Sequence, residues 1–234
     1  MKKQIARLII ALFATLSAVH AEIPVDTTLT LGYDSRYLLY GYRLTRHLYH
    51  ADVYLSHALD EKTTLWGGAW YGYLPDGTYN EVDVYTGIDR TLGEYITIGA
   101  AYSLFNYIEV PYETSDHVSE LAAHATFATD QFSLQFRNQY DSEANGYLLR
   151  GIANYTQPLV EKLSLGLEAE GGYALGYFIQ GNLWNHALAS VKTTYSVTES
   201  LSIEPYITRS IPLAAIDDYE EYDTIYGISA SYFF

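Results

Sequence analysis

The last stretch of the chain, Tyr222 to Phe234 with the sequence YDTIYGISASYFF, indicates the fold most clearly. Counting back in twos from Phe234 gives Tyr232, Ala230, Ile228 and Tyr226, and the positions between them include two serines and a glycine. A period of two predicts a β-strand with one apolar face. A soluble β domain can also end on such a strand, so the remaining sequence has to separate the two possibilities.

The alternation recurs from Thr27 onward in twelve runs of about 10 to 15 residues, the length expected of tilted membrane strands. The runs are 27–40, 47–59, 63–74, 79–90, 94–106, 117–129, 131–141, 146–157, 162–175, 183–197, 200–210 and 222–234. We predict an all-β fold, a transmembrane antiparallel up-and-down β-barrel of twelve strands, with ten strands as the alternative.

Several runs have one apolar and one polar face. Phe132, Leu134 and Phe136 alternate with Ser133, Gln135 and Arg137, and Leu163, Leu165 and Leu167 alternate with Ser164, Gly166 and Glu168. A soluble sandwich would bury the apolar face, whereas a membrane barrel turns it to lipid. The third run is ambiguous, because the face with Trp66 and Trp70 and the face with Leu65 and Ala69 could each contact lipid.

The connections between runs are of two alternating kinds. Tight ones lie at 60–62, 91–93, 129–130, 158–161 and 197–199, and longer ones lie at 41–46, 75–78, 107–116, 141–145, 176–182 and 211–221. Outer-membrane barrels have short periplasmic turns and longer outer loops, so both chain ends should be periplasmic. Pro205 lies within the eleventh run and cannot donate a ladder hydrogen bond, so we expect a bulge or a late strand start there.

The first 21 residues form a typical secretory signal. Lys2, Lys3 and Arg7 precede an apolar run from Leu8 to Leu16, and small residues flank the expected cleavage point near Ala21. The apolar run is too short to span a bilayer as a helix. A single barrel domain is therefore expected over residues 22–234. No later apolar run has the length of a transmembrane helix, so membrane insertion would require a closed barrel.

The composition limits the partners. Residues 22–234 carry ten basic and 28 acidic residues, which argues against nucleic acid as a partner and favours cations, neutral solutes or lipopolysaccharide bridged by divalent ions. The sequence has no cysteine, so disulfides, thiolate metal sites and a lipid-anchored cysteine are excluded. Its 25 tyrosines suit membrane interfaces. The expected interface girdle comprises Tyr37, Tyr40, Tyr42, Tyr102, Tyr107, Tyr177, Phe178 and Trp184.

Two resemblances point in the same direction. The final strand, with Tyr226, Ile228, Tyr232 and the terminal Phe234, resembles the assembly signal of bacterial outer-membrane barrels. The segment from Gly32 to Tyr107 resembles the TorF-like family of outer-membrane porins in its stretches 35–41 (SRYLLYG), 66–70 (WGGAW) and 81–83 (EVD). It departs from that pattern in having Tyr40, not arginine, before Gly41. The resemblance implies an outer-membrane location and a pore, with no known substrate.

If the apolar faces meet lipid, the opposite faces collect charged residues in the barrel interior. The pore-lining candidates are Asp34, Arg36, Asp52, Glu81, Asp83, Asp89, Glu120, Arg137, Arg150, Glu168, Glu170, Lys192 and Glu204. An acidic excess along a narrow passage lowers the energy of cations and raises that of anions. The alternative is that these residues pair with one another and fill the barrel as a plug.

Catalysis has weaker support in the sequence. His50, Asp52 and Ser56 contain the residue types of a hydrolase triad, but no recognisable hydrolase motif surrounds them. His47 and His50 could bind a surface metal, although two nearby histidines are more often solvated. We therefore expect no catalytic residues, cofactor or metal.

The sequence predicts a passive, weakly cation-selective diffusion channel for small solutes in the cell outer membrane. Outer-membrane lipid, lipopolysaccharide and the barrel assembly machinery are the expected partners, and the oligomeric state stays open. One alternative is a closed structural or adhesive barrel that binds partners through its acidic loops 107–116 and 211–221. The other is an outer-membrane lipid hydrolase.

Overall fold

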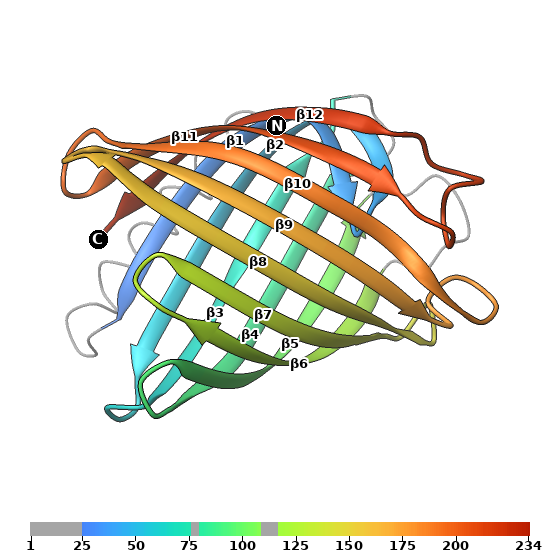
Figure 1. The fold of residues 1–234 in the computed structure, drawn as a ribbon, viewed down its shortest axis with the longest axis horizontal. Helices are drawn as coiled ribbons and strands as arrows, with labels where there is room; N and C mark the ends of the chain where they lie inside the picture. Colours follow the sequence, from blue (N-terminus) through green and yellow to red (C-terminus); the bar gives the residue numbers. More distant parts are fainter. Residues whose placement is uncertain (1–24, 76–79, 109–116) are drawn as a thin grey trace.

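The chain folds into a closed barrel of twelve antiparallel strands, as predicted (Figure 1). The structure is a computed structural model that describes residues 25–75, 80–108 and 117–234. Each strand pairs with its neighbours in sequence. The strands are β1 (Asp26–Leu39), β2 (Tyr42–Ala58), β3 (Thr63–Tyr73), β4 (Asn80–Leu92), β5 (Ile96–Ile108), β6 (His117–Ala128), β7 (Phe132–Asp141), β8 (Gly146–Val160), β9 (Leu163–Leu175), β10 (Asn182–Ser196), β11 (Leu201–Pro212) and β12 (Asp223–Phe233).

The first and last strands close the barrel. Thr28 of β1 lies opposite Phe233 of β12, and the pairing continues in one register to Asp34 and Gly227. The backbone N–H of Phe234 donates to the carbonyl of Thr27 at 3.0 Å. Closure leaves no strand edge with unpaired backbone groups, which is the condition for a sheet to lie in lipid. Among the described residues no helix has the length and apolarity of a membrane span.

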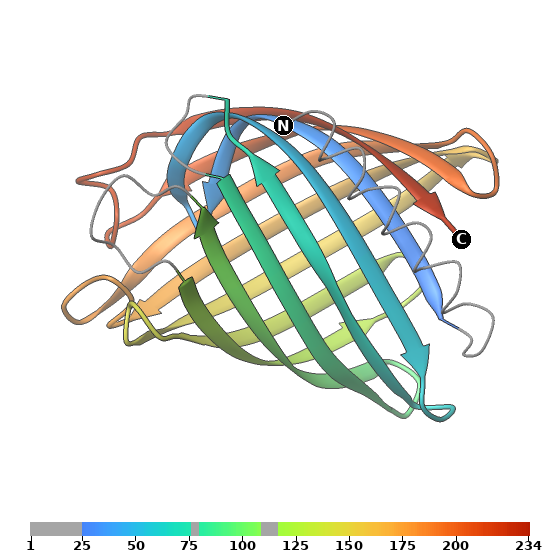
Figure 2. The ribbon, with the colours of Figure 1, turned by 180° about the vertical axis from the view of Figure 1, so that it is seen from behind.

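The two ends of the barrel differ in their connections (Figures 1 and 2). At the end where the chain terminates, which we call the turn end, the connections are 59–62, 93–95, 129–131, 161–162 and 197–200. At the opposite end, the loop end, residues 142–145, 176–181 and 213–222 connect strands. The predicted loops at 75–78 and 107–116 fall largely, and the signal segment wholly, outside the described residues.

The predicted long loop at 41–46 is wrong. β2 begins at Tyr42, so Tyr40 and Gly41 alone join the first two strands. Both residues have positive φ angles, 51° and 88°, as in the two-residue turns that match the twist of a hairpin. A register shift between Tyr37 and Leu38 follows directly below this turn. The tyrosine concealed the turn, because tyrosine rarely adopts a positive φ.

The expected bulge or late start at Pro205 is also wrong. Pro205 lies opposite Ile228 in an unbroken register between β11 and β12. On the other side, the pairing with β10 runs from Pro212 to Tyr206 and resumes at Ile203 without a shift. Glu204 and Pro205 have no paired residue on β10. The missing N–H is therefore accommodated by a local gap in one ladder.

The outward faces of the strands are apolar. Val84 and Ile88 on β4, Phe136 on β7 and Ile228 on β12 are all exposed, with Phe136 at 62%. An apolar surface of this extent is typical of a lipid-facing barrel. On β3 the exposed face carries Leu65, which resolves the ambiguity of this strand and directs Trp66 and Trp70 inward.

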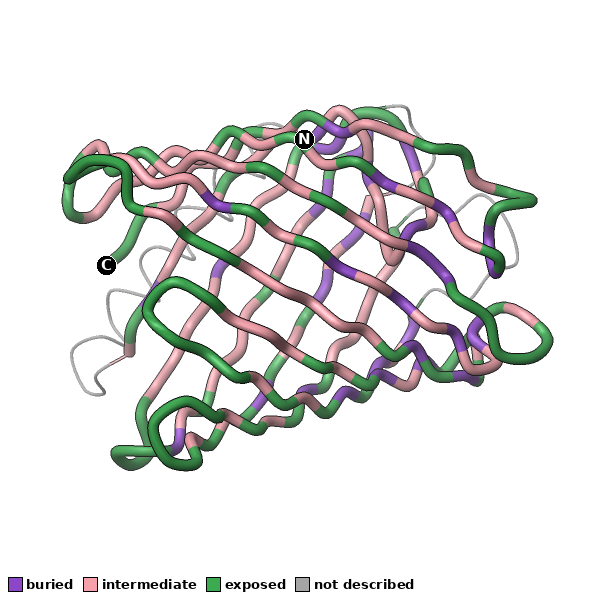
Figure 3. The backbone as a smooth tube through the Cα atoms, in the orientation of Figure 1, coloured by how far each residue is buried: buried purple, intermediate pink, exposed green. Residues whose placement is uncertain are grey.

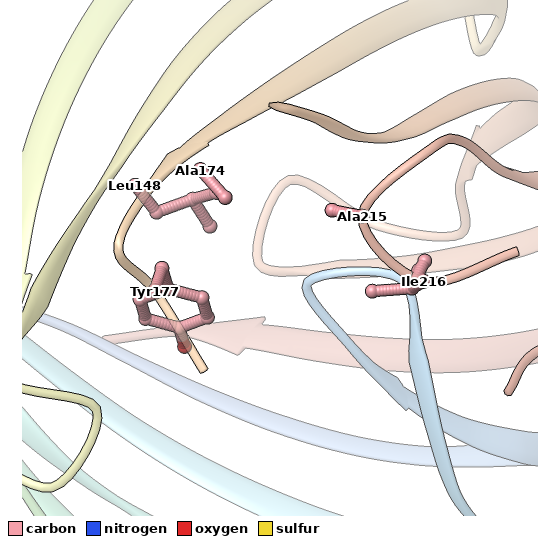
Figure 4. Packing of buried hydrophobic residues seen from close by; sticks show 5 residues of the cluster. All are labelled: Leu148, Ala174, Tyr177, Ala215 and Ile216. Atoms are coloured by element: carbon pink, nitrogen blue, oxygen red, sulfur yellow. The ribbon is translucent and has the colours of Figure 1, made fainter. Parts of the chain in front are cut away.

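Burial is concentrated toward the loop end (Figure 3). There, loops close over the ends of β8 and β9 in a group that we call the cap cluster, consisting of Leu148, Ala174, Tyr177, Ala215 and Ile216 (Figure 4). Tyr40 and Tyr42 of the first hairpin pack against it. At Gly41 an added Cβ would lie 2.6 Å from His186 Cβ, so the hairpin turn rests directly on the inward face of β10. One side of the loop end is therefore filled.

Candidate functional site

The thirteen predicted pore-lining residues all lie on the inward strand faces. Successive side chains of a strand alternate between its two faces, and in each strand the candidates alternate with the exposed apolar side chains. On β9, for example, Glu168 and Glu170 point inward and Leu167 between them is exposed. Nine of the thirteen fall into two groups. One group forms a paired network on β6 to β9, and the other surrounds a cavity lined mainly by β1 to β5 and β9 to β12.

The paired network compensates each of its charges. Arg137 Nη2 lies 3.1 Å from Glu120 Oε1, and Arg150 contacts both carboxylate oxygens of Glu170 at 2.7 Å. His186 Nε2 lies 2.8 Å from Glu170 Oε1 on the next strand. Such fork-to-fork pairing of arginine with a carboxylate has high geometric specificity. We call Glu120, Arg137, Arg150, Glu170 and His186 the paired wall.

The first hairpin reaches across the interior to this wall. The Tyr40 hydroxyl donates to Glu120 Oε2 at 2.8 Å, and the Arg150 guanidinium carbon lies 4.9 Å above the Tyr40 ring. Burial, together with the Glu120 carboxylate, raises the pKa of Tyr40 above its usual value. Burial also raises the pKa of Tyr177 beside it. Both phenols are therefore neutral at ordinary pH, and the Tyr40 hydroxyl acts as a donor that fastens the cap cluster to the barrel wall.

Below the cap cluster the interior contains a cavity of about 570 Å³. Its lining comes from both sides of the barrel, with Asp83 on β4 and Glu168 on β9. Among its ionisable Asp, Glu, Lys, Arg and His side chains, carboxylates predominate, because Asp34 and Asp52 also line it, while Arg36 is its one Lys or Arg and His50 its one histidine among the described residues. The Arg36 charge is already compensated by Asp223, whose Oδ2 lies 2.7 Å from Arg36 Nε. The cavity is therefore an acidic environment.

Two of these carboxylates have no positive partner. Asp83 is 8% exposed, and its Oδ1 atom is buried without a hydrogen bond. Within the described ranges Asp83 forms no ion pair, and Glu168 forms neither an ion pair nor a hydrogen bond. The other two are hydrogen-bonded by tyrosines, Asp52 by the Tyr85 hydroxyl at 2.8 Å and Asp34 by the Tyr206 hydroxyl. Asp34 Oδ2 also lies 3.4 Å from His50 Nε2. We call Asp34, Asp52, Asp83 and Glu168 the open carboxylates.

The short motifs that resemble the TorF-like family converge on this cavity. Tyr37 of β1 and Trp70 of β3 have ring centroids 5.7 Å apart, and both residues line the cavity together with Asp83. Glu81 is fully buried two positions from Asp83 on the same inward face of β4. Three sequence segments that are separated by up to about 50 residues thus supply one wall of the cavity.

The remaining candidates form separate contacts. Asp89 Oδ1 lies 3.2 Å from His124 Nε2, and Glu204 Oε1 lies 3.7 Å from Lys192 Nζ. The proposed assembly residues all face outward and are exposed, with Tyr226 at 58%. Their recognition by an assembly factor stays a prediction.

Two readings of the aromatic and histidine residues need correction. Tyr37 and Tyr177 are buried and Tyr40 reaches inward to Glu120, so these three do not belong to an interface girdle, whereas Phe178 and Trp184 are exposed as expected. His47 hydrogen-bonds Tyr33, while His50 stacks on Trp70 in the interior, so the two histidines form no joint site.

The triad considered from the sequence is not assembled. His50 and Ser56 are six positions apart on β2, which separates them by about 20 Å along an extended strand. Asp52 accepts its hydrogen bond from Tyr85 instead. In the part of the chain that the structure describes, no group of three His, Asp or Glu side chains could hold a metal ion.

Sequence reasoning missed several residues of the site. His186, Gln139 and Tyr40 connect the paired wall, and Tyr85 and Tyr206 hydrogen-bond the open carboxylates. Gln139 and Tyr85 alternate in step with the predicted inward residues Arg137 and Asp83. Alternation nevertheless carries no signal for their partners, which come from neighbouring strands or from across the barrel.

Comparison with solved structures identifies the fold. The chain is similar to the KdgM porin, solved alone and in complex with disordered oligogalacturonate, at 15% identity and TM-scores of 0.55 and 0.54, over 89% of this chain and 99% of that one. It is similar to the COG4313 outer membrane channel from Pseudomonas putida F1 at 11% identity and a TM-score of 0.56, over 90% and 95% of the chains.

A third similar structure is the NanC porin, at 12% identity and a TM-score of 0.55, over 88% and 98% of the chains. No family model and no curated protein matches the sequence. The chain thus has the fold of outer-membrane porins and channels, and its resemblance to the TorF-like family rests on the short motifs alone.

Proposed function

We propose that the protein is an outer-membrane channel for small solutes with a preference for cations. The observation that carries the proposal is the cavity in the barrel interior, where four carboxylates face one arginine, itself paired with Asp223, and one histidine beside Asp34. In a low-dielectric passage, uncompensated negative charge favours cations and disfavours anions. Oligogalacturonate, the polyanion bound by the KdgM porin, would be a poor solute for such an interior.

The test is the conductance of protein purified from outer membranes and inserted into a planar bilayer with a KCl gradient. We expect discrete openings with a reversal potential of the sign for cations. The double variant Asp83→Asn, Glu168→Gln should move the reversal potential toward zero. The control Asp130→Asn, Glu161→Gln removes the same charge from exposed turns and should leave it unchanged. Equal shifts in the two variants would contradict the proposal.

A closed structural or adhesive barrel is the second candidate, because the cap cluster and Tyr40 fill one side of the loop end. It predicts a silent bilayer even when the protein is folded. Heat-modifiable migration on a gel verifies folding independently of conductance, so a folded but silent protein would favour this second candidate.

The proposed placement in the cell puts the turn end in the periplasm, after removal of the signal near Ala21. Short turns beside the chain end support this orientation. The exposed Phe234 is proposed to act in assembly, and the motifs around the cavity support kinship with the TorF-like family. Deleting Phe234 should lower the amount of folded barrel in outer membranes, and N-terminal sequencing of the purified protein would locate the cleavage.

A further inference from the structure

We infer that the cavity binds protonated organic amines with an apolar or aromatic body. This inference rests on the proposed function and names the class of solute. It combines two properties of the lining, its uncompensated carboxylates and its rings.

The carboxylates supply the charge preference. The buried Asp83 Oδ1 lacks a hydrogen-bond donor, and Glu168 faces the same cavity from β9 without a partner among the described residues. A buried acceptor without a donor is costly, and a ligand that brings N–H donors and a positive charge removes that cost. A quaternary ammonium would supply the charge but no donor, so protonated amines fit better.

The rings supply the second half of the site. Trp70, Tyr85, Phe105 and Tyr206 line the cavity alongside Leu48 and Leu188. Aromatic faces attract organic cations and also bury an apolar body. His50 already shows this combination within the protein, since its ring stacks on Trp70 at 6.1 Å while its Nε2 lies 3.4 Å from Asp34 Oδ2.

A metal cation fits the cavity less well. Calcium and magnesium require several convergent oxygen ligands, and no cluster of three suitable side chains exists in the described part of the chain. The open carboxylates are instead distributed over β1, β2, β4 and β9. A volume of about 570 Å³ lies within the range of small-molecule sites.

The experiment is calorimetric titration of the detergent-solubilised full barrel with benzylammonium chloride, with benzyl alcohol and KCl as comparison ligands. We expect saturable binding of benzylammonium and at least about tenfold weaker binding of benzyl alcohol, because only the amine pairs with the carboxylates. Asp83→Asn should weaken benzylammonium binding by about tenfold, and Asp130→Asn in an exposed turn should have no effect. Phe105→Leu, which keeps an apolar side chain, should weaken benzylammonium binding less than Asp83→Asn does.

Equal binding of benzyl alcohol and benzylammonium, or unchanged affinity in a folded Asp83→Asn variant, would overturn the inference. The titration does not require an open pore, so its result is independent of the conductance test. Binding by a protein that is silent in bilayers would support the amine site and refute the channel. Cation-selective conductance without benzylammonium binding would refute the amine site and leave the channel standing.

Discussion

The paired wall and the open carboxylates both place ionisable groups in the barrel interior, but they differ in how the charge is compensated. On β6 to β10, Glu120 and Glu170 each contact an arginine, and Glu170 also contacts His186. Around the cavity, Asp83 and Glu168 have no positive partner in the described part of the chain. Both regions arise from the same strand alternation, so the difference lies in which residues face each other across adjacent strands.

We expect this difference to separate stability from the proposed function. A compensated buried pair is strongly disturbed when one partner is removed, because the other charge is then left buried alone. An uncompensated buried carboxylate already bears that cost in the native protein. Sites that break a rule of packing or pairing are often functional, and the protein loses some stability to keep them. The paired wall should thus control folding, and the open carboxylates should control the passage of solutes.

The largest effect is expected from Arg150→Leu. The change leaves Glu170 with His186 as its remaining partner and removes one of the positive groups near Glu120, so the free energy of unfolding should fall by about 3–5 kcal/mol. Urea unfolding in lipid vesicles, followed by tryptophan fluorescence, measures it. Arg209→Leu, at an exposed arginine on β11, is the control and should cost under about 1 kcal/mol. If Arg150→Leu lowered the free energy of unfolding as little as Arg209→Leu does, the paired wall would not be a structural unit.

Tyr40→Phe tests the link between the two regions. The phenylalanine keeps the ring under Arg150 but removes the hydroxyl that donates to Glu120, at an expected cost of about 1.5–3 kcal/mol. Loosening of the first hairpin should also raise single-channel conductance, because Tyr40 reaches across the interior. Tyr102→Phe, which removes an exposed hydroxyl near Ser119, is the matched control. Unchanged stability and conductance would mean that Tyr40 does not fasten the cap cluster.

Asp83→Asn should act in the opposite direction to the changes in the paired wall. It replaces a buried carboxyl that lies beside the buried Glu81 with a neutral amide of almost the same shape, so the free energy of unfolding should rise by about 0.5–2 kcal/mol. The same urea titration measures it, with Asp130→Asn in an exposed turn as the control. If Asp83→Asn destabilised the barrel as Arg150→Leu does, the two regions would not differ in the way argued above.

The sequence predicted the barrel because its signals are local. Strand alternation, as at Phe132 to Arg137, depends on neighbouring residues and placed all thirteen interior candidates on the inward faces. The prediction of the connections failed where local signals were misleading. At Tyr40, for example, a tyrosine adopts a positive φ angle, which is typical of glycine and asparagine. A two-residue turn therefore looked like the start of a loop.

The division of the interior could not be predicted from alternation. Whether Glu170 meets Arg150 depends on the register between β8 and β9, and Tyr40 meets Glu120 only because the first hairpin bends across the barrel. The choice of face on β3 depended on space, since Gly87 on β4 leaves room for the Trp66 ring. Such contacts join residues far apart in sequence, which a single sequence does not reveal.

The smallest effect on stability is expected from Lys192→Met. Its amine lies 3.7 Å from Glu204, but the two side chains are 34% and 29% exposed, so water screens the pair. Exposed pairs contribute at most about 1 kcal/mol, and the free energy of unfolding should change by less than that. Removing the lysine nevertheless leaves Glu204 uncompensated in the interior, so the reversal potential should move further toward the cation limit.

Lys192→Met therefore separates two effects of an ion pair, its contribution to the stability of the barrel and its effect on the net charge of the interior. If the paired wall is structural because its ion pairs are buried, removal of a solvent-exposed ion pair on the same inward faces should change selectivity and leave stability nearly unchanged. Urea unfolding and the KCl-gradient reversal potential, measured on the same preparation, give both quantities. A loss of stability comparable to that of Arg150→Leu would show that pairing alone, irrespective of burial, supports the barrel. The assignment of function to uncompensated charge would then fail.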